Sequence, residues 1–130
     1  MATQSIGLTG EAIVEVINGF TAAEQVVAAV AAEPGWTVVG ALWVPVDVTA
    51  QLELIGLVTD AALAMTARLY NATDAAIVSG TAVSTSSLVD ERKVSGAVVV
   101  AGGKLYQVQV EVVGPVAGLG VVRGASLLST

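Results

Sequence analysis

After its first third, the sequence is divided into short runs in which apolar and polar residues alternate. The clearest run spans residues 104–113, where Tyr106 and Val108 alternate with Gln107 and Gln109. A period of two places successive side chains on opposite faces of a β-strand, so one face is apolar and the other is polar. Strand-length runs predict strands at residues 37–44, 52–58, 63–70, 97–101, 104–113 and 120–128.

Residues that favour turns separate these runs. Gly, Pro, Asn or Asp occur at residues 45–47, 59–60, 71–74, 102–103 and 114–115. Strands at this spacing without intervening helices are typical of a β-sandwich or a jelly roll. We therefore expect residues 36–130 to form an all-β domain, an antiparallel β-sandwich with jelly-roll-like order. Gly102 and Gly103 predict a tight hairpin between two neighbouring strands.

Residues 1–35 follow a different pattern. Thr21 and Glu24 have the spacing of a helix capping box, and an alanine-rich run continues to residue 32 before Glu33, Pro34 and Gly35. This pattern favours a short helix, which would make the segment a separate helical or arm-like region that forms interfaces.

Two other interpretations of this segment remain open. The valines of residues 26–30 are β-branched, and residues 13–17 have a strand-like pattern, so a strand or an extended arm is equally consistent. A β-α-β unit over residues 13–44, within an α+β shell-forming protein, is a third interpretation that requires substantial helix.

The irregular stretch at residues 77–94 is rich in Ser and Thr and contains the charge cluster of residues 90–93. We interpret it as one strand followed by an exposed connection. Because most other apolar residues are small, Phe20, Trp36 and Trp43 are expected to be large anchors of the core.

The absence of cysteine and histidine from the sequence excludes disulfides, thiol nucleophiles and Ser-His triads. The glycines of residues 114–120 lack the lysine of a phosphate-binding loop, and the serine cluster contains no nucleophile elbow. Asp90 and Glu91 are adjacent, and neighbours in a strand point to opposite faces, so a solvated pair explains them better than acid-base catalysis. We expect a protein that is not an enzyme and has no cofactor.

Calcium is the metal for which the predicted turns offer acidic ligands. Asp47, Asp60 and Asp74 all lie in predicted turns, which in a sandwich can gather at one end. Their spacing matches no calcium-loop motif, and Asp is a common turn residue. We therefore expect no metal site.

The charge balance also argues against nucleic acid as a partner. Eleven acidic and five basic residues give a net charge of -6, with no basic run that could follow a phosphate backbone. No stretch of about 20 residues is continuously apolar, which argues against a membrane span. The first residues lack the basic and apolar regions of a signal peptide, so we expect synthesis in a cytoplasm.

Only 12% of the residues are charged, whereas soluble domains average about 25%. Such a surface should expose apolar patches larger than a monomer tolerates unless subunit interfaces cover them. This composition indicates a homo-oligomer.

Several segments together resemble accessory β-sandwich domains of bacteriophage virions. The relevant residues are 36–45, the run Arg68-Leu69-Tyr70-Asn71-Ala72-Thr73, the hydroxyl-rich residues 84–87 and the run Gly103-Lys104-Leu105-Tyr106-Gln107-Val108. The resemblance covers residues 36–130 and does not separate head proteins from tail proteins. It implies a jelly-roll-like fold, self-association, often as trimers, and docking on a major capsid or tail protein. The implied role is a structural decoration of a virion assembled in the host cytoplasm.

Three residues are candidates for ligand or surface contact: Arg68, Tyr70 and Tyr106. The alternative function to which they point is a carbohydrate-binding β-sandwich, in which an exposed aromatic ring stacks on a sugar. That function predicts that Tyr70 or Tyr106 is exposed.

Overall fold

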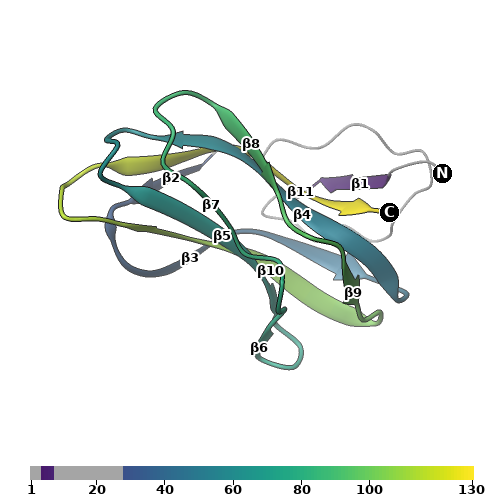
Figure 1. Cartoon of the computed structure of the whole chain (residues 1–130). Coiled ribbons are helices and arrows are strands. Elements are labelled where there is room, and N and C mark those ends of the chain that lie inside the picture. Colours follow the sequence, from purple (N-terminus) through teal and green to yellow (C-terminus); the bar gives the residue numbers. More distant parts are fainter. Residues whose placement is uncertain (1–3, 8–27) are drawn as a thin grey trace.

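The structure is a computed structural model that describes residues 4–7 and 28–130 (Figure 1). These residues form two antiparallel sheets and contain no helix. Within them, accordingly, there is no helix long and apolar enough to cross a membrane. The all-β sandwich expected from the sequence is confirmed.

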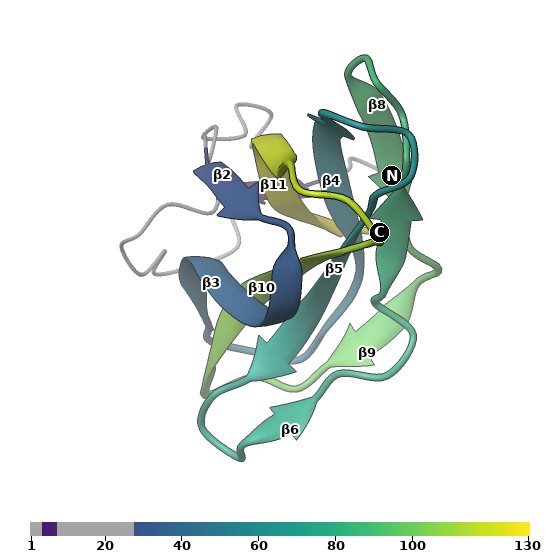
Figure 2. The ribbon, with the colours of Figure 1, turned by 90° about the vertical axis from the view of Figure 1, so that its left-hand side faces the viewer.

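The first sheet has the order β2-β11-β4-β8, and Figure 2 shows these strands side by side in one layer. Its two edges are each made of two short strands in line. At one edge, β2 pairs with the start of β11 and β1 pairs with its carboxyl-terminal half. At the other edge, β8 and β9 pair with successive segments of β4. The bounds are β1 (Gln4–Gly7), β2 (Ala28–Ala31), β4 (Val48–Val58), β8 (Glu91–Val94), β9 (Val98–Val100) and β11 (Leu119–Ser129).

The second sheet has the order β3-β10-β5-β6, with β7 also paired to β5. The central strand β10 pairs with β5 from Tyr106 to its end and with β3 at its start. The bounds are β3 (Glu33–Val44), β5 (Ala64–Asn71), β6 (Ala76–Ile77), β7 (Val83–Thr85) and β10 (Lys104–Val113).

Most connections cross from one sheet to the other. The chain alternates between sheets from β2 through β5, returns to the first sheet at β8 and β9, and then adds β10 and β11 to the centres of opposite sheets. The antiparallel pairs are therefore nested: β2 with β11, β3 with β10, β4 with β8 and β9, and β5 with β6 and β7. This nested order is that of a jelly roll.

The core lies between the sheets and consists mainly of valine and leucine. Burial along β5 alternates strictly, so that Met65, Ala67 and Leu69 are buried while Thr66 and Arg68 point outward. The six strands predicted from alternation are all present, as β3, β4, β5, β9, β10 and β11, with bounds that match or differ by a few residues.

The predicted helix is wrong where the structure describes it. Residues 28–31 form β2, which pairs with the edge of β11, and Val30 is buried in the core. Pairing of this segment satisfies backbone groups that β11 would otherwise expose at a sheet edge. The sandwich thus includes residues before Trp36. Gly35, which has a φ of 119°, lies inside β3 rather than at the end of a helix. Phe20 lies outside the described residues, as do residues 13–27 of the proposed β-α-β unit. The rest of that unit, residues 28–44, contains strands and no helix.

Two further predictions need correction. Residues 77–94 contain β7 and β8 rather than one strand and an exposed connection. Most of the charge cluster lies in β8, which pairs with β4, and Arg92 forms an ion pair with Glu53 of that strand. Gly102 and Gly103 do not close a hairpin. β9 pairs with β4 in the first sheet and β10 lies in the second, so this turn connects the two sheets.

Candidate functional site

The outer face of the second sheet gathers most of the chain's aromatic side chains. Registers place Trp43 opposite Leu105, Tyr70 opposite Gln107 and Arg68 opposite Gln109 on this face. Trp36, from the start of β3, also reaches it, because its ring contacts Arg68. We call this surface the aromatic–arginine face; its residues are Trp36, Trp43, Arg68, Tyr70, Gln107 and Gln109.

Arg68 is held in place from two directions. Its guanidinium carbon lies 3.8 Å from the centroid of the Trp36 ring. Its Nε donates a hydrogen bond of 2.9 Å to Oε1 of Gln109, whose own amide nitrogen lies 3.4 Å from Oε1 of Gln107. A guanidinium stacked on an indole and hydrogen-bonded at Nε has little rotational freedom left. The cation of this face is therefore preorganised.

Arg68 also differs from the other basic residues in its charge partners. Arg92, Lys93, Lys104 and Arg123 each form an ion pair with a carboxylate. Within residues 4–7 and 28–130, no carboxylate lies within ion-pair distance of Arg68. Its positive charge is consequently not neutralised within the described part of the chain.

The prediction that Trp36 and Trp43 anchor the core is wrong. Trp43 is 37% exposed, and Trp36 is half-buried against Arg68. The reason is the alternation of β3, in which Leu42 and Val44 are fully buried and Trp43, between them, must point outward. The largest side chain of the core is instead Tyr106.

Tyr106 cannot serve as a surface contact. Its side chain is only 1% exposed, and its hydroxyl donates a hydrogen bond of 2.6 Å to the carbonyl of Ala101. Burial raises the pKa of its hydroxyl, with smaller effects from nearby charges. Of the three candidate contact residues, the structure brings Arg68 and Tyr70 together on one face and places Tyr106 beneath it.

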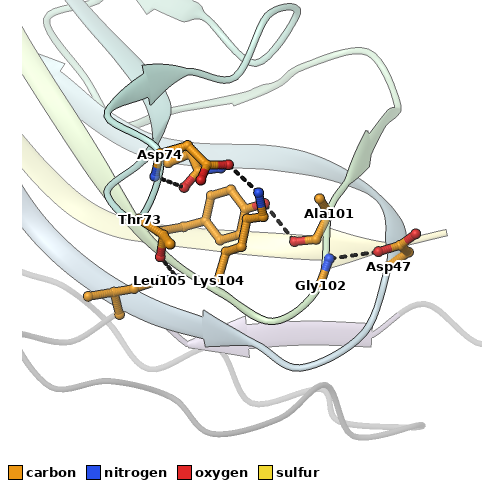
Figure 3. A network of polar contacts seen from close by, with 9 residues as sticks. Asp47, Thr73, Asp74, Ala101, Gly102, Lys104 and Leu105 are labelled. Atoms are coloured by element: carbon orange, nitrogen blue, oxygen red, sulfur yellow. Dashed lines mark hydrogen bonds and ion pairs between the residues drawn. The ribbon is translucent and has the colours of Figure 1, made fainter.

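A polar network fixes the loops at the end of the sandwich where β10 begins (Figure 3). Asp74 forms an ion pair with Lys104, and Asp47 accepts a hydrogen bond of 2.8 Å from the amide of Gly102. Thr73 Oγ1 accepts a hydrogen bond of 2.9 Å from the amide of Leu105, the residue paired with Trp43. The network thus holds the start of β10 beside the aromatic–arginine face.

Two of the three turn aspartates considered for calcium belong to this network. Asp47 and Asp74 do lie at one end of the sandwich, but Asp60 follows β4 and lies at the opposite end. The hydrogen bond from Lys104, assisted by its charge, lowers the pKa of Asp74. Among the described residues there is no group of three or more acidic side chains placed to hold a metal ion.

A second exposed surface lies at the end of the sandwich opposite this network. Leu88 and Val89 follow β7, while Val113, Val116 and Leu119 surround the connection from β10 to β11, and all five are exposed. The large exposed apolar side chains at this end are all aliphatic. This apolar end provides a contrast to the aromatic–arginine face, where rings, amides and a cation occur together.

Sequence reasoning missed the two tryptophans as surface residues. For Trp43 the sequence did contain a signal: it lies between Leu42 and Val44, and strict alternation places it on the face opposite theirs, away from the core. Trp36 carried no such signal, because its position depends on a contact between β3 and β5.

Comparisons of the chain with protein-family models, with curated proteins and with solved structures found no match.

Proposed function

We propose that this chain is a non-enzymatic structural protein that associates with itself through the aromatic–arginine face and docks on a protein lattice. One observation carries the proposal: Trp36, Trp43, Tyr70 and Arg68 are gathered on the outer face of one sheet. Trp, Tyr and Arg are the residue types that most often dominate binding energy at protein interfaces.

The placement of the rings strengthens this argument. The chain has two tryptophans, two tyrosines and one phenylalanine, and three of these five aromatic residues lie on the aromatic–arginine face. Burial of an aromatic ring is among the larger favourable contributions to folding, yet the core is built mainly from valine and leucine. Rings left at the surface are better explained by a contact with another molecule.

The virion role is supported by the sequence resemblance described above. The jelly-roll order agrees with it at the level of fold, because capsid and lectin domains both use this architecture. The proposed partners are a second copy of the chain and a major capsid or tail protein. The lack of histidine and cysteine in the sequence supports a role without catalysis.

Light scattering over a dilution series tests self-association. We expect a stable oligomer that Trp43→Ala and Tyr70→Ala weaken. Val99→Ala is the matched control, because Val99 is 70% exposed on β9 in the other sheet. A wild-type monomer at every concentration would contradict self-association, and retention on purified phage capsids or tails tests the docking.

Carbohydrate binding is the second candidate, and the exposed ring of Trp43 favours it. Trp43 lies beside Leu105, two residues from Gln107, whose amide could bond sugar hydroxyls while the indole stacks on the ring. Retention on a glycan array that Trp43→Ala and Tyr70→Ala abolish, with the fold unchanged, is the expected result. Equal retention of wild type and both variants would dismiss this candidate.

A further inference from the structure

The aromatic–arginine face has an acidic residue at its border. Glu111 lies two residues after Gln109 on β10, and Gln109 is paired with Arg68, so Arg68 and Glu111 occupy diagonal positions on one face. Oε2 of Glu111 accepts a hydrogen bond of 2.9 Å from the amide of Gly35. Both charged groups are therefore fixed by the fold.

These two charges do not neutralise each other within the chain. In the part of the chain that the structure describes, no basic group lies within ion-pair distance of Glu111, and no acidic group lies within that distance of Arg68. Long side chains at diagonal positions on two antiparallel strands, about 7–8 Å apart, can reach each other. Here Arg68 is instead held by Trp36 and Gln109, and Glu111 by the amide of Gly35.

We infer that two copies of this chain pair through the aromatic–arginine face about a two-fold axis, with Arg68 of each copy facing Glu111 of the other. A two-fold contact uses the same patch on both subunits, so it requires a surface that is complementary to itself. An unpaired cation and an unpaired anion side by side meet that requirement, because an axis passing between them places each opposite its counterpart.

Charge complementarity favours a second copy over an unrelated acidic partner. The chain has a net charge of -6, so two copies repel each other unless opposite charges face at the contact. The face contributes one cation and one anion, which gives two reciprocal attractive pairs in the dimer. Trp43 and Tyr70 on the same face supply aromatic contact area. This inference rests on the proposed self-association and specifies its geometry.

Charge reversal tests the inference. In Arg68→Glu, two acidic groups face each other at both contacts, and in Glu111→Arg two basic groups do. We expect each variant alone to weaken the dimer at least about tenfold by sedimentation equilibrium. An equimolar mixture of the two variants should form a heterodimer of wild-type affinity, because both contacts then join opposite charges. The double variant Arg68→Glu/Glu111→Arg should also dimerise.

The matched control reverses an ion pair elsewhere. Arg123 and Asp90 form an exposed pair associated with the first sheet, so Arg123→Glu and Asp90→Arg change the net charge equally without touching the face. We expect both controls to dimerise. Circular dichroism of every variant verifies the fold, and Arg68→Ala gives a milder test if a reversal prevents folding.

Each outcome separates the inference from the proposed function. Dimerisation that fails in each single variant and returns in the mixture supports the inference. A trimer, or an oligomer that both reversals leave unchanged, overturns it and leaves self-association standing. Loss in the single variants without recovery in the mixture also overturns it. A monomeric wild type overturns both.

Discussion

The guanidinium carbon of Arg68 lies 3.8 Å from the centroid of the Trp36 ring, although these residues belong to strands on either side of β10. The contact therefore links β3 to β5 across the central strand of the second sheet. It also fixes the direction in which the cation is presented.

This stacking should be measurable as a coupling energy. A partly buried cation–π pair contributes about 0.5–2 kcal/mol. We expect a double-mutant cycle of Trp36→Ala and Arg68→Ala, measured by urea unfolding, to give a coupling in this range. Additive effects of the two substitutions would show that the contact does not stabilise the fold.

The hydroxyl of Tyr106 should contribute to stability, whereas that of Tyr70 should not. Tyr106→Phe removes a buried hydrogen bond to the carbonyl of Ala101 and should lower the free energy of unfolding by about 1 kcal/mol. Tyr70→Phe is the matched control on the outer face, with an expected change within about 0.5 kcal/mol. Equal effects of the two variants in urea unfolding would contradict this assignment.

Gly56 should tolerate no side chain. A Cβ at this position would lie 2.4 Å from the carbonyl oxygen of Val121 and 2.8 Å from Cε of Met65. Because the closer atom is backbone of the paired strand β11, relief requires the sheet to shift, and Gly56→Ala should destabilise the protein by about 1–3 kcal/mol. At Gly96 a Cβ would meet nothing within 4 Å, so Gly96→Ala should change stability by less than about 0.5 kcal/mol. Thermal unfolding of both variants distinguishes them.

Stability should fall at alkaline pH through the network of Figure 3. The hydrogen bond to Asp74 raises the pKa of Lys104 above 10.5, and burial raises the pKa of Tyr106 above 10.0. Since the folded state then holds protons that the unfolded state releases, stability is full below about pH 10 and declines above it. Urea midpoints measured across this range test the prediction. Lys104→Met should make the decline shallower, and an unchanged slope in that variant would exclude Lys104 as a cause.

At acidic pH the ion pair of Asp74 and Lys104 should have the opposite effect, so that stability falls as the pH decreases. The hydrogen bond from Lys104 lowers the pKa of Asp74 below 3.8, so the folded state binds fewer protons than the unfolded state. The stabilisation is present above pH 3.8 and is lost as the pH falls through the lowered pKa. In Asp74→Asn this acid-dependent component should be absent from urea midpoints. A wild-type slope in that variant would refute the role of Asp74.

The strands were predictable because alternation is a local property of the sequence. β10 begins and ends at the predicted residues, and β4, β5 and β11 differ from prediction by only a few residues. β2 was not predictable in this way. Its four residues, rich in alanine, suit a helix locally, and only the open edge of β11 makes them a strand.

The candidate site was predictable in part. Arg68 and Tyr70 were identified because they lie on the polar face of a clearly alternating strand. Tyr106 shared the chemistry of Tyr70 but lies on the opposite face of its own strand, among buried valines. Trp43 was assigned to the core because of its size, although its neighbours Leu42 and Val44 already occupied the inward positions.

Local alternation in the sequence was enough to predict that residues 36–130 are all-β and which side chains share a face of each strand, because a period of two is set by the pleat of a single strand. The arrangement of the strands depends on contacts across the folded molecule. The turn at Gly102 and Gly103 could have closed a hairpin, but β9 pairs with β4 and β10 pairs with β5, so the two strands lie in different sheets. In the same way, the position of Trp36 over Arg68 depends on β3, β10 and β5 being neighbours. Such contacts join residues far apart in the chain, and no local pattern encodes them.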